Sequence, residues 1–172
     1  MKKLLGLVVL FLSGSVFAEE AAPAASSPLA PLESLVGGVW VATVPMPKDQ
    51  VPLQIETRYV WADNHQAIRF GSTFLRGGKR LPYTDGFYAW NAEKRKIAIF
   101  YTDSGGGLVE GLITPEGEVL LNELVSTTAD GGKLQIQARV TKDGPDAYTN
   151  AIFMQKDGGW APFVTVRYER RK

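Results

Sequence analysis

The sequence has no cysteine and a single histidine, His65, among its 172 residues. Without cysteine the chain can form no disulfide, zinc–thiolate site, cysteine nucleophile or iron–sulfur cluster. One histidine also excludes ligand sets that need two or more histidines. We therefore expect no metal site, and a fold that depends on its hydrophobic core alone.

The chain also lacks an excess of charge of either sign. It carries 19 Lys and Arg against 18 Asp and Glu, a formal net charge of +1. Proteins that bind nucleic acid depend on basic surfaces that neutralise phosphates. The basic ending, RYERRK, fits a solvated terminus. We expect no nucleic-acid partner.

Long apolar runs are missing except at the N-terminus, which reads MKKLLGLVVLFLSGSVFAEE. Two lysines, an apolar run over 4–12 and small residues before Glu19 are typical of a secretory signal peptide, and the run is too short for a stable membrane span. We expect cleavage after Ala18, so that residues 1–18 are the signal peptide. The mature protein is then periplasmic or secreted, with no membrane span and, because it lacks cysteine, no lipoprotein anchor.

The next segment, residues 19–30, is rich in Ala, Pro and Ser and shows no apolar period. Such a segment buries too little surface to offset its ordering entropy, so we expect a flexible leader. Residues 31–172 then form one domain. This domain begins with PLESLVGG, where Pro31 suits the first position of a helical turn and Gly37 suits its end.

Beyond Gly38, strand-like runs recur about every ten to twelve residues, and we find no amphipathic helix of useful length. Turn signals such as RGGK, PEG, ADGG and KDGG separate the runs. Connections this short join antiparallel neighbours, and closing the sheet removes its exposed edges. The sequence therefore predicts an all-β fold, an antiparallel up-and-down β-barrel of about ten strands with a short N-terminal helical cap. The predicted strands cover 39–44, 53–62, 66–75, 84–91, 96–103, 108–114, 118–127, 133–141, 147–155 and 160–169.

Gly38-Val39-Trp40, between the helical turn and the first strand, resembles the opening of barrels of the calycin superfamily, which includes lipocalins, fatty-acid-binding proteins and nitrobindin-like proteins. The segment 88–120 also resembles small lipocalin-like domains of bacteria, and the resemblance covers most of residues 32–170. In lipocalins the tryptophan closes one end of the barrel beside an arginine from near the C-terminus. The resemblance implies this structural role for Gly38, Trp40 and Arg167, the arginine that lies within the last predicted strand.

The chain departs from each of these families in part. No helix precedes the last strand, as one does in lipocalins, and PMPKDQVP is too short for the helical lid of fatty-acid-binding proteins. Those proteins hold a carboxylate with an inward Arg-x-Tyr pair, whereas Arg167 and Tyr168 are adjacent and face opposite ways. Nitrobindin-like barrels ligate haem through a histidine late in the chain, but His65 is early. We therefore expect no haem and no other cofactor.

The stretch YTDSGGGLVEG, residues 101–111, contains three consecutive glycines. A phosphate cradle needs such backbone amides at a helix N-terminus, but a strand pattern follows these glycines. We interpret the stretch as a turn braced by Asp103 and Ser104, with a glycine at positive φ.

Four residues are candidates for ligand binding. Glu110 and Glu123 each share a strand face with apolar residues, and a carboxylate turned inward needs a partner such as Arg69. Tyr101 shares its face with Ile97 and Ile99. The ligand-binding set is therefore Arg69, Tyr101, Glu110 and Glu123, although the strands that carry the two glutamates could instead turn these faces to solvent.

The sequence leaves three functions open. The first is an exported barrel that binds a small apolar or amphipathic molecule. The second is an enzyme on the same barrel that uses an inward Glu and Arg for acid–base chemistry, and the third is a barrel with a filled interior that serves as an envelope interaction protein. We predict no catalytic residue, because His65 suits a surface turn better than a general base. The size and charge of the barrel interior separate the three.

Overall fold

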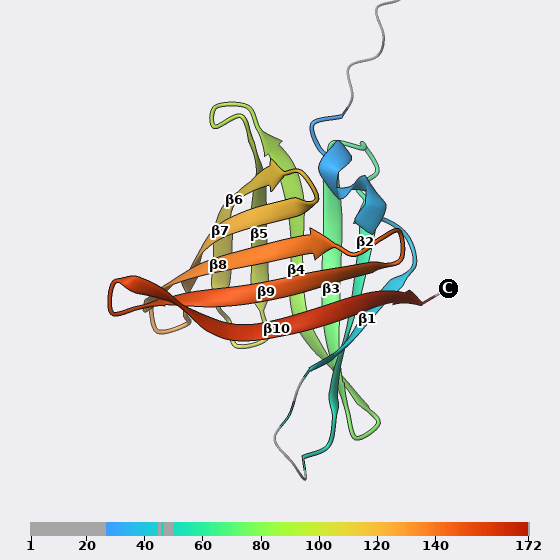
Figure 1. Cartoon of the computed structure of the whole chain (residues 1–172), viewed down its shortest axis with the longest axis vertical. Coiled ribbons are helices and arrows are strands. Elements are labelled where there is room, and N and C mark those ends of the chain that lie inside the picture. Colours follow the sequence, from blue (N-terminus) through green and yellow to red (C-terminus); the bar gives the residue numbers. More distant parts are fainter. Residues whose placement is uncertain (1–26, 45, 47–49, 172) are drawn as a thin grey trace, which may run out of the picture.

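Each strand of this chain pairs with the strands before and after it, and the first strand pairs with the last (Figure 1). The structure, a computed structural model, describes residues 27–44, 46 and 50–171. Within them the ten strands form one closed antiparallel barrel, which confirms the predicted fold class. The strands are β1 (Val39–Val44), β2 (Leu53–Trp61), β3 (Ala67–Arg76), β4 (Lys79–Asn91), β5 (Lys96–Asp103), β6 (Leu108–Glu116), β7 (Val119–Thr127), β8 (Lys133–Lys142), β9 (Ala147–Lys156) and β10 (Gly159–Arg171).

Closure occurs between β1 and β10, where Trp40 lies opposite Arg170 and Ala42 opposite Tyr168. The ladder therefore has no free edge along these strands, which removes a surface for unwanted strand pairing. A closed ladder also fixes the register, so alternate residues of each strand face the interior. In β8, for example, Ile136, Ala138 and Val140 line the interior.

The main difference from the predicted boundaries is in β4, which begins at Lys79 rather than at residue 84. Pro82 interrupts the sequence pattern because proline cannot donate to a strand ladder. The pairing with β3 shifts register at this point, between Ser72 and Thr73, and this irregularity accommodates the proline.

The triple glycine forms the turn between β5 and β6, as the sequence predicts. Asp103 Oδ1 accepts hydrogen bonds from the amides of Gly105 (2.8 Å) and Gly107 (3.0 Å), and Gly106 has φ +80°. The amides that an anion would need are therefore occupied by the chain's own carboxylate. The stretch is a turn, not a phosphate cradle.

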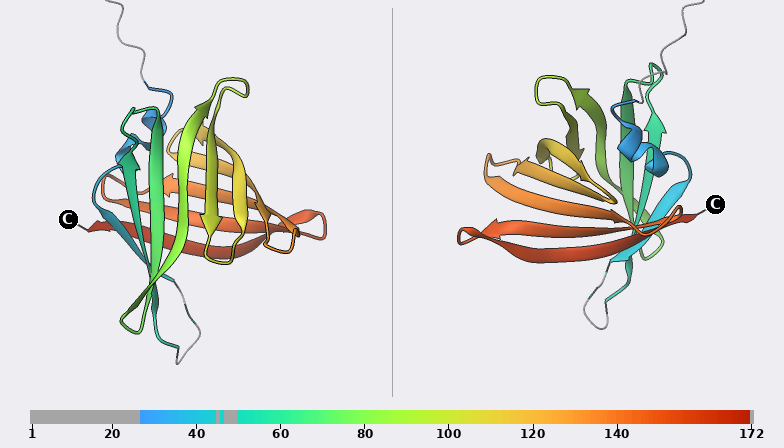
Figure 2. Two further views of the ribbon diagram at one scale, coloured as in Figure 1. Left: turned by 180° about the vertical axis from the view of Figure 1, so that it is seen from behind. Right: turned by 45° about the horizontal axis from the view of Figure 1, so that its top comes forward.

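A short 3-10 helix, η1 (Ala30–Leu35), precedes β1 and lies across one end of the barrel (Figures 1 and 2). Its residues Leu32 and Leu35 are buried in the core, and so is Leu29, which is 2% exposed. The packed part of the chain thus begins before Pro31, because Leu29, near the end of the expected leader, reaches the core. The expected signal peptide and the leader up to residue 26 lie outside the described residues.

Because the strands alternate in direction, the connections alternate between the two ends of the barrel. The β2–β3, β4–β5, β6–β7 and β8–β9 connections lie at the η1 end, and the β3–β4, β5–β6, β7–β8 and β9–β10 connections lie at the other end (Figure 1). No helix in the described part of the chain has the length and apolar character needed to cross a membrane.

Candidate functional site

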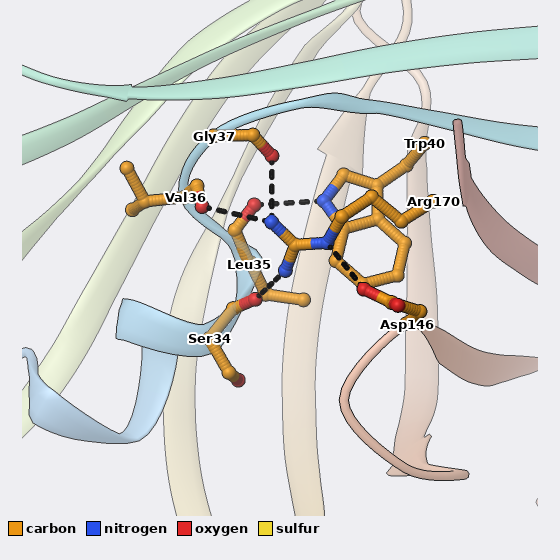
Figure 3. Close-up of polar contacts among 7 residues, drawn as sticks. All are labelled: Ser34, Leu35, Val36, Gly37, Trp40, Asp146 and Arg170. Carbon is orange, nitrogen blue, oxygen red and sulfur yellow. Dashed lines mark hydrogen bonds and ion pairs between the residues drawn. The ribbon is translucent and has the colours of Figure 1, made fainter. Parts of the chain in front are cut away.

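One end of the barrel is closed by Trp40, which is 2% exposed. Its indole Nε1 donates a hydrogen bond to the carbonyl oxygen of Leu35 at 2.7 Å, and this bond ties β1 to the end of η1 (Figure 3). The ring also contacts Tyr148, with ring centroids 4.9 Å apart. The tryptophan is therefore held by both its polar and its apolar atoms.

Arg170 covers the outer side of this tryptophan, with its guanidinium carbon 4.4 Å from the ring centroid (Figure 3). The guanidinium donates to the carbonyl oxygens of Ser34, Val36 and Gly37, and its Nε lies 3.3 Å from a carboxylate oxygen of Asp146. These carbonyls end a helical turn, where backbone oxygens lack intrahelical partners. Arg170 thus fastens η1 over the barrel end.

The arginine that packs on Trp40 is Arg170 and not Arg167, which the resemblance had indicated. Arg167 is exposed and pairs with Asp143 and Glu169 on the outer surface. The reason is strand parity: Arg170 lies opposite Trp40 in the ladder, whereas Arg167, three residues earlier, points to the other side. Gly38 has the expected place beside this pair, at φ +70°, where a Cβ atom would lie 3.1 Å from the Arg170 side chain.

A group of tyrosines lies beneath the closed end. The hydroxyls of Tyr59 and Tyr148 are hydrogen-bonded at 3.1 Å, and the rings of Tyr148 and Tyr168 stack with centroids 4.7 Å apart. Burial raises the pKa of Tyr59, Tyr88 and Tyr148 well above the usual value for tyrosine and raises the pKa of Tyr168 to about 12. These phenols are therefore neutral at physiological pH and act as hydrogen-bonding groups, not as charges.

The barrel encloses a cavity of about 580 Å³, which runs from η1 toward the opposite end. Phe163 lines the cavity and is also 62% exposed, so the mouth lies at the end where β9 turns into β10. None of the described residues that line the cavity is charged, and most of them are aliphatic or aromatic. Small-molecule sites have volumes of roughly 300–1,000 Å³ and mostly apolar linings, so this cavity falls within the usual range.

A few uncharged polar side chains interrupt the apolar lining. On the side of β2 and β3, the hydroxyls of Thr57 and Ser72 are hydrogen-bonded to each other at 2.9 Å. On the side of β7 and β9 lie Asn122 and Asn150. In the order of the closed sheet, β2 and β7 are five strands apart in either direction, so these two polar groups face each other across the cavity.

Of the four residues predicted to bind ligand, the structure places only Tyr101 on the cavity wall. Arg69, Glu110 and Glu123 are exposed on the outer surface. Arg69 and Glu110 belong to one row of the outer face, but Phe87 and Phe100 lie between them in that row. Glu123 forms an ion pair with Lys96, with 3.9 Å between Oε2 and Nζ. The apolar neighbours of both glutamates share this outer face, so an apolar strand face is not an inward face here. The expected inward pairing of a glutamate with Arg69 does not form.

The two asparagines were not among the predicted site residues. Their signal in the sequence is a lone polar residue on an otherwise apolar face: Asn122 lies between Leu120 and Leu124, and Asn150 between Tyr148 and Ile152. His65 is exposed at a turn with φ 53°, as expected of a surface residue. Within the described ranges, no group of three or more acidic or histidine side chains could hold a metal ion.

No family model and no curated protein matches the sequence. Among solved structures, the chain is similar to Rv2717c from M. tuberculosis, whose crystal structure superimposes with a TM-score of 0.57. The match covers 84% of this chain and 98% of Rv2717c, at 13% sequence identity. At this identity the likeness shows that the two proteins share the barrel fold and does not extend to function.

Proposed function

We propose that this protein is an exported, calycin-like barrel that binds a small apolar or amphipathic molecule in its interior. The observation that carries the proposal is the cavity of about 580 Å³, with its apolar lining and its few polar side chains. A lining of this kind gives affinity through burial of apolar surface and orientation through a small number of hydrogen bonds. The signal-like N-terminus supports the exported location.

The two other functions have less support. Acid–base catalysis by an inward Glu and Arg needs charged groups in the interior, whereas Arg69, Glu110 and Glu123 are on the outer surface. A filled barrel would leave no room inside, whereas this interior holds space for a molecule of moderate size. Ligand binding is therefore the function that this arrangement of side chains supports best.

Native mass spectrometry of the protein purified from the periplasm of its own source tests the proposal. We expect a bound small molecule that is released when the protein is denatured. The matched variants are Ala138→Phe, which fills the cavity from β8, and Gln137→Phe, which adds the same side chain to the outer face of that strand. The first variant should lose the bound mass and the second should keep it. A folded parent protein that carries no ligand, and that takes up no apolar compound in solution, would contradict the proposal.

A further inference from the structure

The two asparagines on the cavity wall lie on either side of β8, in neighbouring rows of inward-facing residues. Asn122 belongs to the row that contains Ala138 and Ile152, and Asn150 belongs to the row that contains Leu120 and Val140. In these two rows β8 contributes Ala138 and Val140, so the two amides are polar groups in an otherwise apolar part of the wall. This placement allows one bound molecule to reach both side chains.

The orientation of Asn122 is set by the backbone. Its Nδ2 donates to the carbonyl oxygens of Leu120 (2.9 Å) and Ala138 (3.1 Å), a role that only the nitrogen of the amide can take. Both N–H groups are therefore used within the wall. The remaining polar atom, Oδ1, is an acceptor that can receive a hydrogen bond from a ligand.

Asn150 holds hydrogen-bonding capacity that the protein itself does not use. Its Oδ1 is buried and has no hydrogen-bond partner among the described residues. Burying a polar atom in this way is unfavourable, so side chains of this kind usually find a partner. Asn150 lines the cavity, and a half-turn of its amide about the Cβ–Cγ bond exchanges the positions of its oxygen and its nitrogen. A ligand that carries a hydroxyl or an amide N–H supplies the missing partner.

The same wall disfavours ligands that carry a charge. An ion buried without a counter-charge is strongly unfavourable, and none of the described lining residues is charged. The tyrosines beneath the closed end are neutral as well, because burial raises the pKa of their hydroxyls. A carboxylate, a phosphate or an ammonium group would therefore lose its hydration inside the cavity and find no ion to replace it.

We infer that the cavity selects uncharged molecules that combine an apolar ring system with a hydroxyl or N–H group. Asn122 and Asn150 recognise this polar group. The inference rests on the proposed function, because it names the chemical class of the ligand for the same cavity. The hydroxyl pair of Thr57 and Ser72 on the opposite wall offers a second polar contact to a ligand that spans the interior.

Two fluorescent probes that differ by one charged group test the selection against charge. N-phenyl-1-naphthylamine is neutral and has one N–H, and 1-anilinonaphthalene-8-sulfonate is the same skeleton with a sulfonate added. We expect saturable binding of the neutral probe, and at least about tenfold weaker binding of the sulfonate. The Ala138→Phe variant should abolish binding of the neutral probe, which shows that the signal comes from the cavity and not from exposed aromatic residues.

The possible outcomes separate this inference from the proposed function. If the two probes bind the cavity with affinities less than tenfold apart, the selection of neutral ligands is overturned and the proposed function stands. If the neutral probe does not bind, or binds equally well to Ala138→Phe, the inference about the ligand class is overturned, and the proposed function is decided separately by native mass spectrometry of the parent protein.

A second pair of compounds tests the role of the asparagines. The competitor 1-phenylnaphthalene resembles the neutral probe in size but has no N–H. Asn150→Leu should weaken binding of N-phenyl-1-naphthylamine by about fivefold and leave 1-phenylnaphthalene as tight or tighter, because only the first loses a hydrogen bond. An equal change for both compounds would mean that Asn150 shapes the cavity without recognising the ligand.

Discussion

The closed end of the barrel and the wall of its cavity treat their polar groups in opposite ways. At the closed end, Trp40 donates a hydrogen bond to a backbone carbonyl, and the hydroxyls of Tyr59 and Tyr148 are hydrogen-bonded to each other. Arg170 donates to three backbone carbonyls and forms an ion pair with Asp146. On the cavity wall, Asn150 Oδ1 is buried with no hydrogen-bond partner among the described residues. The first region uses its polar groups to hold the fold together, whereas the second includes a polar atom, Asn150 Oδ1, that no described residue satisfies.

Alkaline pH should lower the free energy of unfolding most, through the tyrosines beneath the closed end. Tyrosine in an unfolded chain loses its proton near pH 10, whereas Tyr59, Tyr88, Tyr148 and Tyr168 keep theirs because burial raises each pKa. The stabilisation is therefore complete below about pH 10 and is lost as the pH rises above it, by about 1.4 kcal/mol per tyrosine for each pH unit. Denaturant unfolding across this pH range measures the loss. Tyrosinate absorbance that rises near pH 10 while circular dichroism stays unchanged would show that these phenols are open to water.

Trp40→Ala should have the next largest effect. It removes a buried ring and the hydrogen bond to Leu35, and we expect a loss of about 3–5 kcal/mol in the free energy of unfolding. Trp40→Phe keeps most of the apolar contact and should lose less. The measurement is denaturant unfolding of the purified variants, and an unchanged midpoint for Trp40→Ala would mean that the closed end contributes little to stability.

Substitutions of Arg170 and Arg167 compare an arginine of the closed end with an exposed arginine of the same strand. Arg170→Leu leaves three backbone carbonyls without their donor and should lower the free energy of unfolding by about 2–3 kcal/mol. Arg167→Leu removes two ion pairs of an exposed arginine on the same strand, with Asp143 and Glu169, and should lower the free energy of unfolding by less than about 1 kcal/mol. Thermal unfolding of both variants gives the comparison. Equal losses would show that Arg170 acts as a surface charge and does not fasten η1.

The smallest effect is expected on the cavity wall. Asn150→Leu removes an oxygen that has no hydrogen-bond partner among the described residues and adds apolar surface to the interior. We expect the free energy of unfolding to change by less than about 1 kcal/mol, toward greater stability. A large loss in denaturant unfolding would show that the asparagine belongs to the structural framework, as the closed end does.

The strands and turns could be predicted from the sequence because short antiparallel connections and alternating side chains are local signals. Trp40 could be placed at a barrel end only through a resemblance, because Gly38-Val39-Trp40 after a helical turn is similar to the opening of known barrels. Which face of a strand points inward was harder to predict, because β6 and β7 carry apolar residues on both faces. In a closed barrel that choice is set by the register with the neighbouring strands, which is not a local property.

The other differences between the prediction and the structure also depend on contacts that are not local in the sequence. Arg167 and Arg170 both lie near the end of the last strand, and only the pairing of β10 with β1 shows which of them meets Trp40. Leu29 lies in a segment of Ala, Pro and Ser whose composition suggests flexibility, although one apolar side chain is enough to anchor its end in the core. The cavity itself depends on how ten strands enclose space, which no short stretch of sequence encodes.

The position of the chain ends gives the closed end a further consequence. Val39, which follows η1, pairs with Arg171 near the C-terminus, so both ends of the described chain emerge where Trp40 and Arg170 close the barrel (Figure 1). The mouth, marked by Phe163, is at the opposite end. A tag, a fusion partner or a solid support joined at either end of the described chain therefore begins at the closed end of the barrel, away from the mouth through which a ligand enters.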